Sequence, residues 1–434
     1  SPTVNMARLQ SRQISQLHLY QVLHAVRLAR EPLSRAQIAE RTGLSQPSVS
    51  SLTRRLIGSG ALVEAGSRPS NGGGRREREL AINPDHAWVV GVKVAMHQIT
   101  IALSDFAGGV RDTRKVPFAA PLKPAALVKA LTREIEARLD QAGGTVRAGM
   151  AGVGIALPGF IDSMRGEVQW SAVIDSSGGG RGSSAPAPLA DELTEALGVP
   201  VIIENDANML ALAEQWFGQA GRIGNVAVLT LEHGLGLGLI LNGELYRGHS
   251  GLAAELAHVQ VAFDGVPCRC GKTGCLEAYV AHYAIVRQGR EAGLLDVPDA
   301  LPAGEVMAAY TRLAALARAG DETARGIFHQ QGRLLGQWVG NVVNLLAPQL
   351  VLLDGSEAVA SDLYEPALRE AMAQAMVPPH RGHVPLVVRH HGDEVWARGA
   401  ASLVLQRLDE SAEIVEAASR HGLEHERVGR RPDA

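Results

Sequence analysis

The sequence predicts an α/β body of two lobes with a smaller α+β module in front of it. From Trp88 onward, short runs rich in valine, isoleucine and leucine alternate with amphipathic stretches in two successive sets. Residues 1–80 hold 12 arginines, no lysine and five acids, whereas the rest of the 434-residue chain holds 30 basic and 40 acidic residues. A basic module on an acidic body indicates that only the first part binds a polyanion.

In the body, the first set predicts strands over 88–94, 98–103, 110–116, 148–156 and 199–204, with helices over 125–142 and 189–197. The second set predicts strands over 225–231, 237–241 and 350–353, with a long helix over 324–346. Asn242-Gly243 is a hairpin turn. Two such sets indicate two α/β lobes with a ligand cleft between them.

We expect domains over 1–83, 84–204 and 205–410, with a helix near 394–408 packing back on the first lobe. The glycine-, serine- and proline-rich segment 176–188 is expected to be a mobile loop, and the charged tail 411–434 to be disordered. No apolar run approaches 18 residues, and the first residues show no signal pattern. We therefore expect a cytoplasmic protein that does not enter a membrane.

In the front module, two short helices around a tight turn are predicted between residues 33 and 56. Ser34 and Ser45 can cap the two helices through their side-chain oxygens, and Gly43 supplies the turn between them. Apolar residues recur at helical spacing from Val49 to Leu56 and form the buried stripe of the second helix. This is the pattern of a helix-turn-helix motif.

The outward face of the second helix combines short polar side chains with arginines, which suits a helix in a DNA major groove. Two short strands between residues 60 and 80, joined by a glycine-rich basic tip, predict the wing of a winged helix-turn-helix. The alternative is a protein-interaction hairpin with a solvated charged loop. The candidate DNA contacts are Arg35, Gln46, Ser48, Ser51, Arg54, Arg55, Arg75 and Arg76.

All three cysteines of the chain fall within eight positions, and a histidine precedes the first of them by ten residues. Three thiolates and one imidazole are the ligands of a closed tetrahedral zinc site. The alternative is one disulfide and a free thiol, but the odd cysteine count and the absence of a secretory segment argue against it. We therefore expect one zinc ion per chain, bound by His258, Cys268, Cys270 and Cys275.

Six motifs follow one another along the body: Gly154-Ile-Ala-Leu-Pro158-Gly159, Glu204-Asn205-Asp206-Ala207-Asn208, the glycine-containing run 229–238, Asn242 to Gly248, Glu255-Leu-Ala-His258 and the cysteine motif ending at Glu277. By these motifs the body resembles the ROK family (repressors, open reading frames, kinases), and with the front module the likeness covers roughly residues 10–408. The resemblance implies an actin-like/hexokinase-like fold for the two lobes.

The resemblance also implies a sugar site made of Asn205, Asp206, Glu255, His258 and Glu277. Carboxylates and an amide that converge on one face suit sugar hydroxyls, and His258 would bind zinc through one ring nitrogen and the sugar through the other. Each acid has a plainer alternative: Asp206 as a helix cap, Glu255 on a solvated helix face, Glu277 as a helix-start acid. Ala257 replaces a family glycine, which weakens the assignment of Glu255 most.

Family kinases use the aspartate at the position of Asp206 as a general base, so a sugar kinase is an alternative. Their first phosphate loop has an Asp-x-Gly-Gly-Thr pattern, which cradles phosphate and serves the metal–nucleotide end. Here the corresponding positions are Lys93, Ala95 and Met96. We therefore predict no catalytic residue, with Asp206 as a vestigial base position.

The resulting hypothesis is a sugar-responsive transcriptional regulator, a repressor that a carbohydrate bound between the lobes releases from operator DNA. A homodimer or homotetramer is expected, because palindromic operators require at least two modules. Two alternatives are an ATP-dependent ROK-type sugar kinase and a regulator controlled by a protein partner, with a silent sugar pocket. An acidic lining favours a neutral sugar over a phosphorylated one.

Overall fold

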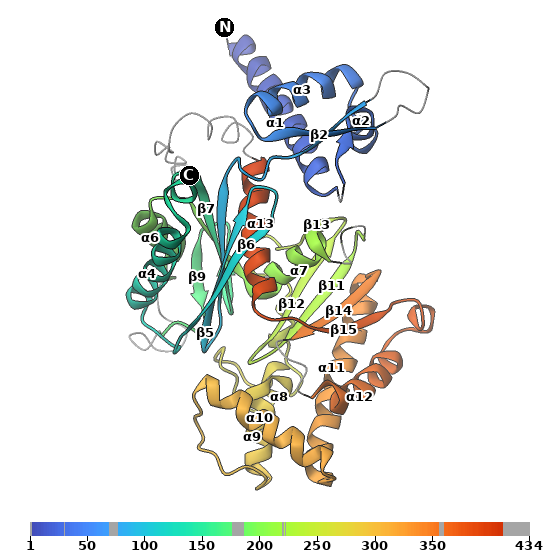
Figure 1. Cartoon of the computed structure of the whole chain (residues 1–434). Coiled ribbons are helices and arrows are strands. Elements are labelled where there is room, and N and C mark those ends of the chain that lie inside the picture. Colours follow the sequence, from blue (N-terminus) through green and yellow to red (C-terminus); the bar gives the residue numbers. More distant parts are fainter. Residues whose placement is uncertain are drawn as a thin grey trace.

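The computed structural model describes residues 2–29, 31–68, 77–175, 186–218, 221, 223–355 and 360–410. A small helical module lies at one end, and two α/β lobes follow it, as the sequence predicts (Figure 1). The tip of the predicted wing with Arg75 and Arg76, most of the predicted mobile loop and the tail from residue 411 lie outside the described residues. Among the described residues, none of the helices is long and apolar enough to cross a membrane.

The front module consists of three helices, α1 (Pro2–Arg27), α2 (Arg35–Thr42) and α3 (Gln46–Gly58), and a three-stranded sheet. The sheet has the order β1 (Leu33–Ser34), β3 (Glu77–Ile82), β2 (Leu62–Arg68). Ser34 and Ser45 cap α2 and α3 as predicted, and Gly43 has the left-handed conformation (φ 71°). The helix-turn-helix expectation is therefore confirmed in its local geometry.

The first lobe is built on a five-stranded sheet with the order β10-β7-β4-β5-β6. The strands are β4 (Trp88–Val94), β5 (Gln98–Asp105), β6 (Val110–Pro117), β7 (Met150–Leu157) and β10 (Val201–Asn205). Helices α4 (Pro124–Ala142) and α6 (Leu189–Leu197) share one apolar core with this sheet, and α5 (Gly144–Ala148) precedes β7.

A hairpin of β8 (Phe160–Asp162) and β9 (Glu167–Trp170) follows β7. Ala187 pairs with Val168 of this hairpin through two backbone hydrogen bonds of 2.9 and 3.0 Å. The C-terminal end of the segment expected to be mobile, residues 186–188, is therefore an ordered continuation of the hairpin, which corrects that expectation for these three residues.

The second lobe has a sheet of order β13-β12-β11-β14-β15. Its strands are β11 (Val226–Leu231), β12 (Leu235–Leu241), β13 (Glu244–Leu245), β14 (Leu350–Gly355) and β15 (Leu386–His390). Helices α11 (Glu322–Leu346) and α12 (Ser361–Ala375) pack on one face of the sheet. Helices α8 (Glu277–Val280), α9 (His282–Glu291) and α10 (Ala303–Arg318) extend the lobe away from the front module (Figure 1).

Two packed helices, α7 (Asp206–Phe217) and α13 (Glu394–Glu410), separate the sheets of the two lobes (Figure 1). Helix α13 lies on the first sheet so closely that a Cβ at Gly91 or Gly154 would overlap its backbone. A Cβ at Gly399 of α13 would likewise overlap the Met209 carbonyl of α7. Helix α7 packs on β11 and β12 of the second sheet, and a Cβ at Gly238 would overlap its backbone. Each helix therefore belongs to one lobe, and their contact is the lobe interface.

Candidate ligand pocket and metal centre

A pocket opens between the two lobes, and all five residues of the predicted sugar site line it. They come from three separate places in the chain: the junction of β10 and α7, the short 3-10 turn Leu256–His258 with the preceding Glu255, and the start of α8. Helix α10 closes one side of the pocket with apolar side chains, among them Val306 and Met307. The structure therefore brings together every residue of that predicted set.

Asn205 and Asp206 lie where β10 passes into α7. The side-chain oxygen of Asn205 accepts from the backbone N–H of Ala207 (2.9 Å) and Asn208 (3.3 Å), so Asn205 is the N-cap of the helix. Its amide nitrogen donates to the Gly159 carbonyl at 3.0 Å, which leaves a second amide hydrogen for a ligand. The capping role considered for Asp206 thus belongs to Asn205.

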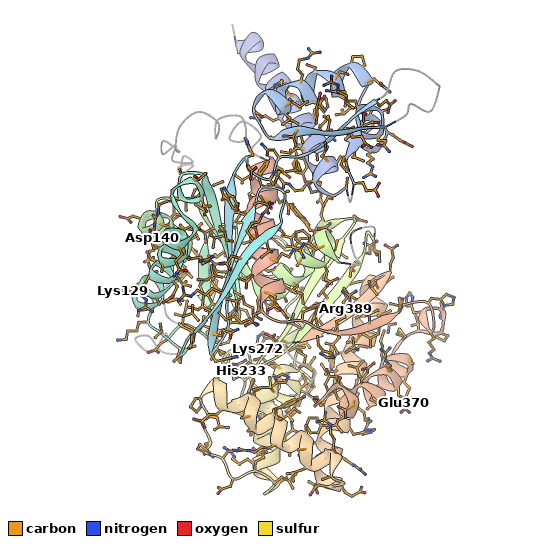
Figure 2. All side chains as sticks on the ribbon, viewed as in Figure 1. Lys129, Asp140, His233, Lys272, Glu370 and Arg389 are labelled. Atoms are coloured by element: carbon orange, nitrogen blue, oxygen red, sulfur yellow. The ribbon has the colours of Figure 1, made fainter. Side chains whose placement is uncertain are left out.

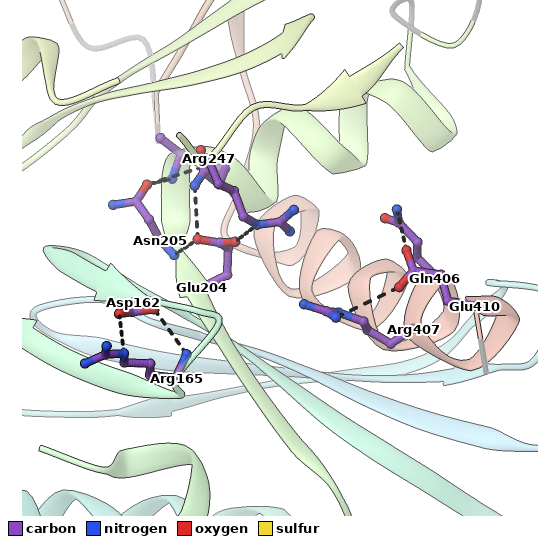
Figure 3. Close-up of polar contacts among 10 residues, drawn as sticks. Asp162, Arg165, Glu204, Asn205, Arg247, Gln406, Arg407 and Glu410 are labelled. Carbon is purple, nitrogen blue, oxygen red and sulfur yellow. Dashed lines mark hydrogen bonds and ion pairs between the residues drawn. The ribbon is translucent and has the colours of Figure 1, made fainter. Parts of the chain in front are cut away.

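A buried ion pair between Glu204 and Arg247 lies beside Asn205 and supports it (Figure 3). Glu204 is fully buried and accepts from Arg247 Nε at 2.6 Å, from Asn208 Nδ2 at 3.0 Å and from the Asn205 backbone N–H at 2.9 Å. Because Arg247 follows β13 in the second lobe, this network ties that lobe to the end of β10 in the first. It holds the start of α7 in position between the lobes.

Asp206 and Glu255 have carboxylates that face the pocket. Burial is the main cause that raises the pKa of Asp206 to about 7, and the nearby ammonium of Lys93 partly opposes it. Burial also raises the pKa of Glu255 to about 8, and the negative charges of Glu277 and Asp206 add to the shift. The solvated helix face considered for Glu255 is wrong, because Glu255 precedes a 3-10 turn and lines the pocket.

Glu277 is buried and fully engaged at the first position of α8. Its Oε1 accepts from Arg269 at 2.9 Å and from the Tyr283 hydroxyl at 3.4 Å, and its Oε2 accepts from the Leu235 N–H at 3.1 Å. Glu277 therefore both begins a helix, as the plainer alternative held, and lines the pocket. Arg269 also stacks on the Tyr283 ring, 4.3 Å from its centroid.

The histidine and the three cysteines of the predicted metal site form one cluster, with all ligand atoms within 4.8 Å of one another. Cys270 and Cys275 have sulfurs 3.7 Å apart, and Cys268 Sγ lies 3.6 Å from His258 Nδ1. All three thiols are free, since a disulfide requires sulfurs about 2.05 Å apart. A tetrahedral ion with Zn–S of about 2.3 Å and Zn–N of about 2.0 Å separates its ligands by about 3.8 Å (S–S) and about 3.5 Å (S–N). The cluster can hold a metal of this kind.

His258 connects the cluster to the pocket. Because Nδ1 faces the cysteines, Nε2 remains for the pocket that the ring lines. Burial lowers the pKa of His258, which favours the neutral ring that a metal ligand must have. From the other lobe, Phe160 and Trp170 meet the His258 ring edge-on, with centroids 5.0 and 6.4 Å away. This aromatic wall was missed in the sequence, where nothing separates it from ordinary core residues.

At the far end of the pocket, Lys93 occupies a position of the first phosphate loop expected from the family kinases. Its ammonium lies 2.8 Å from Glu232, 3.3 Å from Asp393 and 3.8 Å from the centroid of the Trp396 ring. The side chain is 1% exposed, and its pKa is raised because these acids outweigh the cost of burial. The sequence showed the substitution but could not show the partner Asp393, 300 residues away.

The glycines of the run 229–238 pack against protein. A Cβ at Gly236 would approach the Thr230 hydroxyl to 2.5 Å and the Ala207 side chain to 2.8 Å. His233, labelled in Figure 2, lies where the sheets meet the helices α8 to α10, and its ring packs against Tyr283 at 5.8 Å. Burial lowers the pKa of His233, so that it is neutral at pH 7.

In the front module, the predicted DNA-contact residues differ in exposure. Gln46, Ser51, Arg54 and Arg55 are exposed on α3, whereas Ser48 is half-buried against Ser45 Oγ (2.8 Å). Arg35 is half-buried and donates to the Thr53 hydroxyl at 3.0 Å, so it braces α2 against α3. Arg75 and Arg76 lie outside the described residues.

Comparisons with known proteins agree with this architecture. The model of the ROK family matches residues 89–407, and that of the IclR helix-turn-helix domain matches residues 18–66. A xylose repressor of Caldicellulosiruptor bescii is 29% identical over 86% of this chain and 92% of its own length. The transcriptional dual regulator NagC of Escherichia coli K12 is 29% identical over 86% of this chain and 88% of its own length.

Solved structures include both regulators and kinases. A ROK family transcriptional regulator, described as a homologue of the E. coli MLC protein, has a TM-score of 0.76 and 25% identity over 94% of this chain and 99% of its own. A ROK family glucokinase from Streptomyces griseus, solved with glucose and AMPPNP, has a TM-score of 0.59 and 27% identity over 73% of this chain and 99% of its own. The expected hexokinase-like body with a helix-turn-helix module is thereby confirmed, and the chain belongs to the ROK family.

Proposed function

We propose that this protein is a DNA-binding transcriptional regulator that a carbohydrate releases from its operator. The observation that carries the proposal is the pocket, where the five predicted sugar ligands converge between two lobes that are joined to a helix-turn-helix module. The relatives named xylose repressor and NagC support it, since they match along most of their own length. We retain the predicted domain limits at residues 83, 204 and 410, a cytoplasmic location and a homodimer or homotetramer as parts of this proposal.

The proposal includes one zinc ion per chain, bound by His258 Nδ1 and the three cysteine sulfurs. The fit of the spacings and the burial of the thiols support it: burial raises the pKa of Cys268, and a cation would offset the cost of the thiolate. A metal at this place would fix the ring of His258 with Nε2 toward the pocket. His258 would then donate to a sugar hydroxyl, beside the acceptors Asp206 and Glu255.

The lining favours a neutral sugar. Asp206 and Glu255 turn carboxylate oxygens toward the pocket, with one oxygen of Asp206 held by the Ala207 N–H at 2.9 Å. The cations of the pocket are already paired: Arg269 with Glu277, and Lys93 with Glu232 and Asp393. A phosphate group would therefore meet like charges and cations that are already engaged. Trp170 offers an aromatic surface that suits the C–H face of a sugar ring.

The same geometry speaks against ATP-dependent phosphoryl transfer, in which the nucleotide end needs open backbone N–H groups and an acid for magnesium. Here that end holds a cation saturated by two acids and glycines packed against α7. We expect no turnover in a coupled kinase assay across hexoses, pentoses and N-acetylated sugars. A rate near ~1 s⁻¹, the lower end of ordinary enzymes, would establish the kinase alternative instead.

The first experiment is a thermal-shift screen of the zinc-loaded protein against D-xylose, D-glucose, N-acetylglucosamine and their phosphates. A sugar that binds the native state raises Tm by mass action. The neutral form that stabilises the protein should also release it from a duplex selected from a random DNA library. If every sugar leaves Tm unchanged, the pocket is silent, and control by a protein partner becomes the better explanation.

A further inference from the structure

The front module packs on the first lobe through a shared apolar cluster that includes Leu23 of α1 and Leu405 of α13, and Arg27 adds a buried polar contact to this interface. Arg27, the last residue of α1, has a side chain that is 1% exposed, and it forms a two-pronged pair with Asp409: Nε to Oδ2 at 2.6 Å and Nη2 to Oδ1 at 2.7 Å. Its Nη1 donates to the Phe106 carbonyl, and its guanidinium lies 4.5 Å from the centroid of the Phe106 ring. Planar, two-pronged pairs of this kind are geometrically exacting.

The socket around Arg27 is assembled from both lobes. Asp409 lies in the last turn of α13, and Phe106 follows β5, so both belong to the first lobe. Trp216 lies in the last turn of α7, which packs on the second sheet, and its ring centroid is 5.8 Å from the guanidinium. His24, one turn earlier in α1, meets the same indole edge-on at 6.0 Å. Arg27 therefore contacts the two lobes at once.

The helices that end at this socket begin at the pocket. Helix α7 starts with Asp206 and runs about 18 Å to Trp216 and Phe217, at about 1.5 Å per residue. Helix α13 starts one residue after Asp393, the partner of Lys93, and runs about 25 Å to Asp409. Figure 1 shows α13 extending along the first sheet toward the front module, with α7 beside it. Gly399, the sixth residue of α13, lets the helix backbones touch at Met209, the fourth residue of α7, so this close contact lies toward the pocket ends of the two helices.

We infer that Arg27 is the positioning residue through which the pocket sets the orientation of the DNA-binding module. This inference rests on the proposed function. A ligand bound between the lobes rotates α7 against α13 about the Gly399 contact. At the far ends, Trp216 and Asp409 move apart or together. The guanidinium contacts Asp409, the Phe106 carbonyl and the Trp216 face at the same time. When these groups move, Arg27 moves with them and shifts α1, and α1 carries α3 with it. Packed interfaces of this kind switch between arrangements rather than deform smoothly.

The test uses the full chain, a duplex selected by the wild type from a random DNA library, and the sugar that most stabilises the wild type in the screen. In the wild type the sugar should weaken DNA binding by about tenfold or more, within the usual range of coupling between sites. Arg27→Gln should keep DNA affinity without sugar and sugar affinity without DNA within about threefold. It should reduce release by sugar to less than about twofold.

Arg318→Gln is the matched control, because Arg318 forms the same two-pronged pair with Asp362 (2.6 and 3.0 Å), but on the surface of the second lobe. It should respond to sugar like the wild type. Arg27→Lys retains the charge toward Asp409 without the planar fork, so it should restore part of the response, and it replaces Arg27→Gln if that variant fails to fold. A sugar response of Arg27→Gln equal to that of the wild type overturns the inference.

Failure of the proposed function is a separate result: no sugar stabilises the wild type, or none releases DNA. The inference is then decided by a double-mutant cycle on DNA affinity between Arg27→Gln and Asp206→Ala. A departure from additivity of threefold or more supports a connection between pocket and module that passes through Arg27. Additive effects overturn it.

Discussion

The two ends of the pocket differ in how completely their buried charged groups are paired. At the sugar end, Asp206 and Glu255 are desolvated carboxylates with raised pKa values, about 7 and about 8. At the phosphate end, Lys93 is buried more completely, yet it is paired with Glu232 and Asp393. Desolvated carboxylates with few hydrogen bonds cost free energy that a ligand can recover, whereas fully paired groups offer a ligand little. Under the proposed function, the first end therefore binds the sugar and the second is structural.

The largest effect on stability is expected from a change in the histidine and cysteine cluster beside the sugar end of the pocket. Cys270→Ser should lose the metal and lower the free energy of unfolding by about 4 kcal/mol or more, because loss of a metal belongs to the extreme tail of single substitutions. Sugar binding should be lost with it, since His258 is no longer held. Metal content by mass spectrometry and urea unfolding measure both. A metal-free variant of wild-type stability that still binds sugar would remove the metal from the site.

Removing the cation at the phosphate end of the pocket is expected to lower the free energy of unfolding nearly as much. Lys93→Met leaves two buried acids without their cation and should lower the free energy of unfolding by about 3–5 kcal/mol. The control is Lys115→Met, which removes an ion pair with Glu394 whose side chains are about half exposed (3.3 Å), and should change stability by less than about 1 kcal/mol. Equal effects of the two variants in urea unfolding would mean that the phosphate end is not a structural ion-pair cluster.

Removing a hydrogen-bond acceptor at the sugar end should affect sugar affinity and leave stability intact, the reverse of what is expected for Lys93→Met. Asp206→Asn eliminates a desolvated carboxylate, so unfolding should be unchanged or shifted to higher urea concentration. Sugar affinity should fall by about 10- to 100-fold, the usual range for a lost hydrogen bond to a charged group. Calorimetric titration with the stabilising sugar measures the affinity. Strong destabilisation with intact sugar affinity would assign Asp206 a structural role instead.

The smallest effect is a dependence of stability on pH. Folded-state pKa values of about 7 and about 8, against about 4 in the unfolded chain, mean that the folded state retains protons which the unfolded state releases. The stabilisation is complete below pH 4 and is lost as pH rises through 7 and 8. Between pH 7 and 8 the wild type should lose about 1–2 kcal/mol more than the Asp206→Asn/Glu255→Gln variant. Parallel urea midpoints for the two proteins would contradict the raised pKa values.

Much of the site could be predicted because its signals are local. The spacing of Cys268, Cys270 and Cys275 is a property of a few neighbouring residues, and the caps Ser34 and Ser45 act within one helical turn. The sequence also singled out Lys93, but it could not show the role of this residue, because its partners Glu232 and Asp393 are distant in the chain. The capping role of Asn205 was not readable for a different reason, because the adjacent Asn205 and Asp206 are equally suited to it by residue type.

The sequence by itself determined the class of the fold and the helix-turn-helix module, and it predicted the cluster that could hold a metal and the five residues that line the pocket, because short-range spacing and composition dictate these features. Only the tertiary structure decided that the phosphate end is closed by an ion-pair cluster, that Phe160 and Trp170 face His258 across the cleft, and that Arg27 spans both lobes. Each of these depends on side chains from elements far apart in the chain. Their meeting is set by how α7 and α13 pack between the two sheets, which no local pattern encodes.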